Sequence, residues 1–153
     1  MTLFIQLIYT SQVSSDFREH EIPGLLKTIR LANAKLQITG MLFYLGSSFL
    51  QVLEGDAHSV DGVYTRVLVD KRHTQVRTIS RESIEERSFP NWTMDFATVD
   101  PVEAGEIVSD PGSFMDGARL DSHSANRLIA AFRRPKWQQS GSPLMGRIAR
   151  RGR

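Results

Sequence analysis

The segment 48–56 (SFLQVLEGD) sets a glutamine inside a run of apolar residues that has the length of one strand. Four apolar residues surround Gln51: Phe49, Leu50, Val52 and Leu53. A run that is apolar on both faces is typical of a strand covered on both sides. We therefore expect the Gln51 amide to lie away from bulk water, where leaving it unpaired would cost about 1–3 kcal/mol. From this strand alone, a glutamine at a strand end or turned towards solvent is an equal alternative.

Periodic patterns around this strand predict the order β-α-β-β-α-β-β. The other expected strands cover residues 3–9, 38–45, 76–84 and 89–96, and the helices carry apolar stripes at 25–32 and 60–68. Asp56 is the expected N-cap of the second helix. This order predicts an α+β fold, ferredoxin-like β-α-β-β-α-β with an extra fifth strand and a five-stranded mixed sheet.

The remainder of the chain predicts a C-terminal helical extension. Apolar residues at 125–132 have helical spacing, and we expect this helix to cover the sheet face that the first two helices leave open. We divide the chain into a main domain at 1–99, a linker and packing helix at 100–137, and a disordered basic tail at 138–153. Residues 122–153 hold eight basic residues and no acid, whereas residues 1–121 are acidic overall.

Composition excludes several kinds of chemistry. The chain has no cysteine, so disulfides, thiolate catalysis and cysteine-bound metals are ruled out. Its four histidines lie at no metal-ligand spacing, and there is no glycine-rich phosphate loop, so no metal site is expected. The first residues show neither a basic leader nor a long apolar segment, which predicts a cytoplasmic protein without a membrane span.

Uncharged polar and aromatic residues on the expected core elements are the remaining candidates for a site. They are Tyr9, Asn33, Gln51, Trp92 and Met94. Taken singly, each has a plain structural interpretation, because a strand tyrosine is usually core, an asparagine closes helices, and Trp and Met fill cores.

Taken together, these residues lie in five blocks that resemble the BLUF domains, blue-light sensors that use flavin adenine dinucleotide (FAD). The blocks are Leu7-Ile-Tyr-Thr-Ser11, Ile38-Thr-Gly-Met-Leu42, Phe49-Leu-Gln-Val-Leu-Glu-Gly55, Asp70-Lys-Arg-His73 and Phe89-Pro-Asn-Trp-Thr-Met94. The resemblance covers about residues 2–99 and implies that FAD is the cofactor. One departure is Ala32, where many members have a polar residue that hydrogen-bonds the flavin.

The resemblance also implies a role for each matching residue. Tyr9 would donate an electron and a proton to the excited flavin, and the Gln51 amide would then rearrange its hydrogen bonds. The implied flavin contacts are Asn33 at the pyrimidine edge, Phe49 and Leu25 as apolar walls, and Arg66, Arg72 and His73 near the ribityl or phosphate end. Trp92 and Met94 would carry the signal out of the domain.

The leading hypothesis is thus a light sensor without enzymatic activity, since the remaining residues leave no room for a catalytic module. By resemblance we expect a homo-oligomer and a separate effector protein, with the tail helix and its Arg127, Arg133 and Arg134 as the output surface. One alternative is a ferredoxin-like nucleic-acid-binding protein with a basic tail, although the acidic body and the lack of a stacking motif disfavour it. Another is a small flavin-dependent or acylphosphatase-like enzyme, for which the sequence shows no catalytic loop.

Overall fold

The computed structural model describes residues 3–71, 73–91, 93–115, 120–132 and 149–150. Its elements are β1 (Phe4–Val13), the short 3-10 helix η1 (Glu19–Glu21), α1 (Ile22–Leu36), β2 (Thr39–Tyr44), β3 (Ser48–Asp56), α2 (Ala57–Val69), β4 (His73–Ser83), β5 (Asp95–Thr98), α3 (Pro101–Ile107), α4 (Ser122–Phe132) and β6 (Ala149–Arg150). The first part of the chain has the predicted β-α-β-β-α-β-β order, and two further helices follow it.

The strands form one sheet in the order β4-β1-β3-β2-β5-β6. Neighbours pair antiparallel except β2 and β5, which are parallel, so the sheet is mixed. This confirms the predicted ferredoxin-like α+β fold with β5 as the extra strand. The tail expected to be disordered contributes the two-residue β6, which pairs with Ala97 and Thr98 at the edge. Residues 138–148 and 151–153 lie outside the described part.

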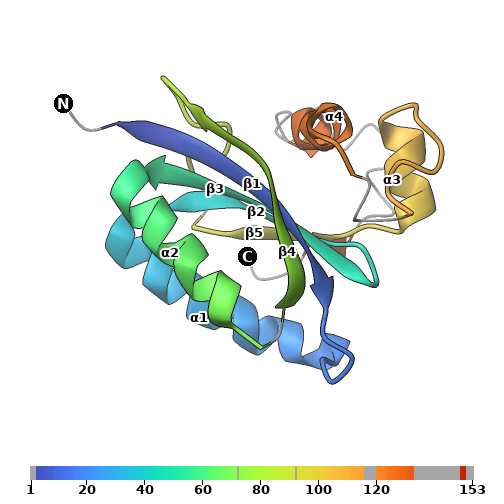
Figure 1. The fold of residues 1–153 in the computed structure, drawn as a ribbon, viewed down its shortest axis with the longest axis horizontal. Helices are drawn as coiled ribbons and strands as arrows, with labels where there is room; N and C mark the ends of the chain where they lie inside the picture. Colours follow the sequence, from blue (N-terminus) through green and yellow to red (C-terminus); the bar gives the residue numbers. More distant parts are fainter. Residues whose placement is uncertain (1–2, 72, 92, 116–119, 133–148, 151–153) are drawn as a thin grey trace.

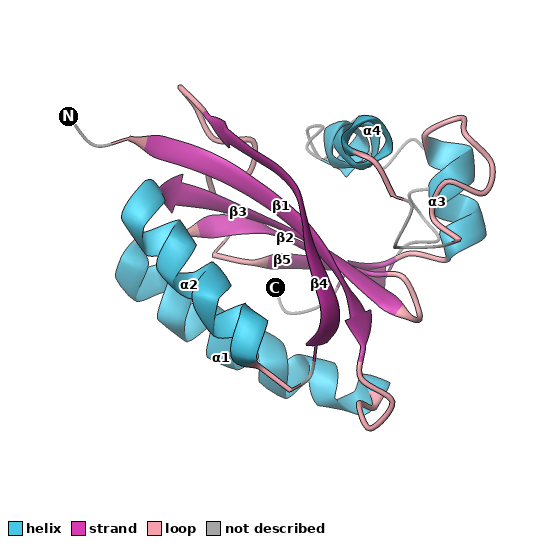
Figure 2. Ribbon diagram, in the orientation of Figure 1, coloured by secondary structure: helices cyan, strands magenta, loops and turns pink. Residues whose placement is uncertain are grey.

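Helices cover both faces of this sheet (Figure 1). Figure 2 shows α1 and α2 side by side on one face and α3 and α4 on the other. Successive residues of β3 alternate between the two layers: Phe49 and Leu53 pack with α1 and α2, whereas Leu50 and Val52 pack with α4. Gln51, between them, is 4% exposed, as the sequence predicted.

The α4 layer is an apolar seam. Ala125, Leu128, Ile129 and Phe132 are all buried in it. The ring of Phe132 meets that of Phe43 on β2 edge-on, with centroids 4.9 Å apart. The apolar stripe of this helix is therefore used inside the domain, while Arg127 on its outer side is exposed.

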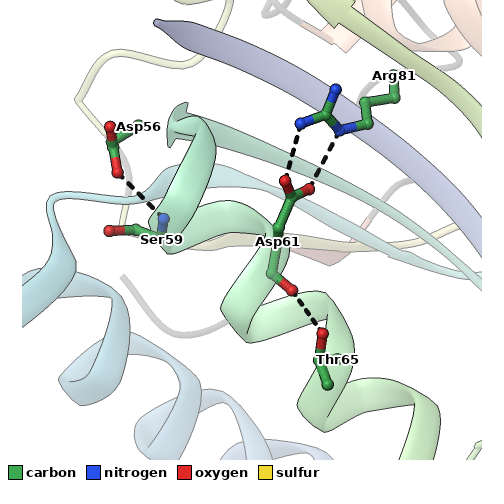
Figure 3. A network of polar contacts seen from close by, with 5 residues as sticks. All are labelled: Asp56, Ser59, Asp61, Thr65 and Arg81. Carbon is green, nitrogen blue, oxygen red and sulfur yellow. Dashed lines mark hydrogen bonds and ion pairs between the residues drawn. The ribbon is translucent and has the colours of Figure 1, made fainter. Parts of the chain in front are cut away.

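Two polar contacts fix α2 on the sheet (Figure 3). The Asp56 carboxylate accepts a hydrogen bond from Ser59 N at 3.1 Å, which makes Asp56 the N-cap that the sequence predicted. One turn into the helix, Asp61 accepts two hydrogen bonds from Arg81 on β4, at 3.1 and 2.8 Å. The Asp61 carbonyl accepts a further bond from the Thr65 hydroxyl.

Gly40 allows β2 and β3 to approach closely. A Cβ atom built on Gly40 would lie 1.9 Å from the carbonyl oxygen of Val52. Any larger residue would therefore push the two strands apart beside Gln51, because the obstacle is backbone rather than a movable side chain.

Several strand boundaries differ from the sequence prediction, and the first strand continues to Val13 rather than ending at Tyr9. The fourth strand starts earlier, at His73, and the fifth starts at Asp95 rather than Phe89. The backbone N–H groups of Ser88 and Phe89 donate to the Glu54 carboxylate, at 2.9 Å each, instead of to a neighbouring strand. Met94 therefore precedes β5, although its side chain packs in the same cluster as Phe96.

No helix in the described ranges is both long and apolar enough to cross a membrane. Over the same residues, no group of three or more His, Asp or Glu side chains is arranged to hold a metal ion.

Candidate functional site

A cavity of about 190 Å³ lies between the sheet and the two helices α1 and α2. Seven of the residues predicted from the sequence line it: Tyr9, Leu25, Asn33, Phe49, Gln51, Arg66 and His73. They come from β1, α1, β3, α2 and the start of β4, so the fold brings together residues that are far apart in the chain.

Tyr9 and Gln51 form the polar centre of the cavity wall. The two residues are direct partners in the register of β1 and β3, so their side chains leave the sheet on the same face. The Tyr9 hydroxyl donates a hydrogen bond to Oε1 of Gln51, and both residues are buried.

The other end of the Gln51 amide contacts Met94. Nε2 of Gln51 donates to the Met94 sulfur at 3.5 Å. Because a thioether sulfur accepts hydrogen bonds but cannot donate them, it favours the amide nitrogen over the amide oxygen. The chain Tyr9–Gln51–Met94 therefore has one preferred amide orientation, in which the phenol faces the oxygen and the sulfur faces the nitrogen.

The environment of Tyr9 keeps its phenol protonated. Burial raises the pKa of Tyr9 far above its ordinary value, and Tyr64 and Asp70 raise it further. The Tyr64 ring lies against Tyr9 with centroids 5.2 Å apart, and its hydroxyl is 2.7 Å from that of Thr78 on β4. Tyr9 is thus available as a hydrogen-bond donor at any physiological pH.

Asn33 lies in the last turn of α1 and is buried against the cavity. Its Nδ2 donates to the carbonyl oxygen of Thr93 at 2.7 Å. The amide is therefore held in a fixed orientation, which gives the cavity a positioned polar group opposite the apolar walls.

Most of the cavity wall is apolar. Phe49 is fully buried and packs against Phe17 and Tyr44, with ring centroids 5.7 and 5.5 Å away. The His73 ring lies 5.4 Å from Phe49, and its Nδ1 is 2.9 Å from the Ser11 hydroxyl. A mostly apolar cavity with a few fixed polar groups is the usual form of a small-molecule site.

Further lining residues were not singled out from the sequence. They are Thr28, Ile29, Leu42, Val63, Val67 and Asp70, together with Ala32, which the sequence marked only as a departure. The apolar members lie within the predicted stripes at 25–32 and 60–68 and the predicted strand at 38–45, which marked them as core rather than as site residues. Met94 does not line the cavity and reaches it through Gln51, while Arg72 and Trp92 lie outside the described residues.

A protein-family model described as sensors of blue light using FAD (BLUF) matches residues 4–95. The chain is similar to the photoactivated adenylate cyclase subunit beta of Euglena longa, with 36% identity over 93 residues, which cover 60% of this chain and 11% of that relative. It is also similar to the blue light- and temperature-regulated antirepressor BluF of Escherichia coli K12, with 31% identity over 70 residues, 46% of this chain and 17% of that relative. The chain thus matches only a small part of these curated relatives.

Solved structures show the same fold. The dark-state structure of BlrB, a BLUF protein, has a TM-score of 0.68 and 26% identity and covers 86% of this chain and 98% of its own. A bacterial light-regulated adenylyl cyclase has a TM-score of 0.59 and 38% identity over 61% of this chain and 27% of its own.

Proposed function

The chain belongs to the BLUF family of blue-light sensors, and from this premise we propose that it is a blue-light photoreceptor that binds FAD in the cavity between α1 and α2. The single observation that carries the proposal is the hydrogen-bonded chain from Tyr9 through Gln51 to Met94 at the wall of that cavity.

The residues of the cavity fit a flavin ring. Phe49, Leu25 and Ile29 offer apolar surface for its faces, and the amides of Asn33 and Gln51 offer the oxygen and nitrogen atoms that its imide edge requires. Arg66, at the same cavity, supplies a positive charge for the ribityl or phosphate end. When bound, FAD supplies blue-light absorption and an excited state that takes up an electron and a proton.

Tyr9 is the proposed donor of the electron and of the proton. Its phenol holds its proton until that step, because burial disfavours the phenolate. Once the proton has left, the Tyr9 oxygen can only accept hydrogen bonds, so its contact with the carbonyl oxygen of Gln51 becomes unfavourable.

Gln51 responds by turning or tautomerising its amide. The new state presents a donor to Tyr9, and after a turn it also places the amide oxygen against the Met94 sulfur, where two acceptors meet. A change of about 1–3 kcal/mol, the scale of one buried hydrogen bond, is enough to bias a two-state element.

Met94 is the proposed first step of the output. It directly precedes β5, which pairs with β2 and ends beside α3. We include Trp92 and Arg72 in the proposal on the resemblance alone. We also propose a cytoplasmic sensor without catalysis of its own, which acts as a homo-oligomer on an effector protein; the names of the relatives join light sensing to adenylate cyclase and to an antirepressor.

The proposed output surface on α4 differs in one respect from the one expected from the sequence. The apolar stripe of α4 is buried against the sheet, so the outer side with Arg127 is the part of this helix that a partner can reach. The same packing disfavours the nucleic-acid alternative, since Phe43 on that sheet face is buried edge-on against Phe132 and is not exposed to a base.

A visible absorption spectrum before and after blue light tests the proposal. We expect bound FAD, a small red shift on illumination and recovery in the dark. Tyr9→Phe and Gln51→Ala should retain the flavin and lose the shift, whereas Tyr44→Phe and Gln12→Ala, outside the cavity lining, should keep both. A normal shift in either cavity variant would contradict the assigned role, and a protein that does not take up FAD would contradict the cofactor.

A further inference from the structure

The two residues that precede β5 are held by side chains of α1. Arg30 Nε donates to the Met94 carbonyl oxygen at 2.7 Å, and Asn33 Nδ2 donates to the Thr93 carbonyl oxygen at 2.7 Å. Arg30 and Asn33 are three residues apart and therefore lie on the same face of the helix. Consecutive carbonyl groups at the start of a strand are thus bonded to one helical turn.

The bond from Arg30 is charge-assisted and so the stronger of the two. Burial lowers the pKa of the Arg30 guanidinium, and the nearby Asp95 carboxylate acts in the opposite direction. The guanidinium therefore occupies a partly enclosed position beside the first residue of β5.

Met94 needs such a tether because its side chain is long and unbranched, with three rotatable bonds. Its sulfur is 3.5 Å from Nε2 of Gln51, within the range of a hydrogen bond to a sulfur acceptor. A shift of the Met94 backbone away from Gln51 would weaken that contact while leaving the Tyr9–Gln51 bond in place.

We propose that Arg30 is a positioning residue of the photosensory site. It holds the Met94 backbone so that the Met94 sulfur responds to the orientation of the Gln51 amide, and a change in that orientation is transmitted to α1. The inference rests on the proposed function and extends it. Two cavity residues then converge on adjacent positions: Gln51 through the Met94 sulfur, and Asn33 through the Thr93 carbonyl.

The chain that connects β4 to β5 is also held at its other end, near Ser88 and Phe89. Glu54 is fully buried and accepts hydrogen bonds from Ser88 N and Phe89 N. Ser88 and Phe89 are thus fixed to β3. A change in the orientation of the Gln51 amide is therefore transmitted through Met94 towards α1 and β5 rather than absorbed by the chain between β4 and β5.

Hydrogen–deuterium exchange of the β5 amides, Asp95–Thr98, tests the tether in the FAD-free protein. We expect Arg30→Met to raise this exchange about tenfold, the factor that corresponds to about 1.4 kcal/mol of local stability. Arg30→Lys, which retains a cationic donor, should restore part of the protection. Lys27→Met is the matched control, because Lys27 is exposed one turn earlier on the same helix.

The FAD-loaded protein tests the coupling. Arg30→Met should keep the red shift, since Tyr9 and Gln51 are untouched, but lose the light-induced change in β5 exchange that the unmodified chain and Lys27→Met show. Dark exchange equal to that of the unmodified chain, or an undiminished light-induced change, would overturn the inference. Absence of a red shift in the unmodified chain would overturn the proposed function instead, and the FAD-free comparison would still decide whether Arg30 holds β5.

Discussion

Tyr9 and Gln51 are direct cross-strand partners, and the hydroxyl of the first donates to the side-chain carbonyl of the second. The register of β1 and β3 therefore fixes this bond, rather than any loop conformation. On its other side, β1 shows a register shift against β4 between Ile8 and Tyr9. Such irregularities often occur beside functional sites, where they adjust the direction of one side chain.

Met94→Leu tests the sulfur contact. Leucine fills a similar volume, so the red shift should persist. Because leucine offers no acceptor to the Gln51 amide, we expect the return to the amide orientation seen here to slow about fivefold, which corresponds to about 1 kcal/mol. The dark recovery of the absorption spectrum measures this rate. Met41→Leu, a buried methionine in the opposite layer, should leave it unchanged, and an equal effect of both changes would contradict a specific role for Met94.

Glu54→Gln tests the anchor between β3 and the segment before β5. The carboxylate accepts bonds from Gln6 Nε2, Ser88 N and Phe89 N, and an amide would turn an NH₂ group towards one of these donors. We expect the free energy of unfolding to fall by about 1–3 kcal/mol in urea titrations. Glu82→Gln, at an exposed position on β4, should change it by less than about 0.5 kcal/mol.

Phe132→Ala tests the α4 layer independently of the cavity. Phe132 is fully buried against Phe43, so its truncation should cost about 3–5 kcal/mol and lower the melting temperature. FAD binding should be retained at temperatures where the variant is folded, because the cavity lies on the other face of the sheet. Asn126→Ala, on the exposed side of the helix, is the control; comparable loss in both variants would argue against this packing.

The buried phenol of Tyr9 predicts a loss of stability at high pH. The pKa of Tyr9 is raised by folding, so the stabilising effect is fully present below the unfolded value near 10 and is lost as pH rises above it. Above that value, this group should lower the free energy of unfolding by up to about 1.4 kcal/mol per pH unit. Urea titrations between about pH 9 and 11 should show a shallower decline for Tyr9→Phe. Equal slopes would mean that Tyr9 ionises as readily folded as unfolded.

Periodicity predicted the fold because the long elements bury continuous stripes. The apolar run around Gln51 is buried on both faces of the sheet. In the stripe at 60–68, Val60 is buried and Val63, Tyr64 and Val67 are partly buried, whereas Leu68 is exposed. The start of the fifth strand was mispredicted, because the N–H groups of Ser88 and Phe89 bond a buried carboxylate from a distant strand. That contact depends on tertiary structure, and no local pattern signals it.

The cavity was partly predictable because polar residues are conspicuous on elements with apolar periodicity. Tyr9, Asn33 and Gln51 stand out as polar residues on apolar elements, and the structure brings all three to one cavity. Arg30 gave no such signal, since an arginine in a helix is ordinarily exposed, and its partner is a backbone carbonyl that any residue could supply.

The alternation along β3 limits how this chain can change over evolution. Gln51 points into one layer, and its immediate neighbours, Leu50 and Val52, point into the other. The helix beneath those neighbours can be exchanged for a different one without rebuilding the cavity wall that holds Gln51. Adding an odd number of residues to β3 ahead of Gln51 would instead turn its amide towards that helix and away from the cavity, so only changes of two residues preserve this wall.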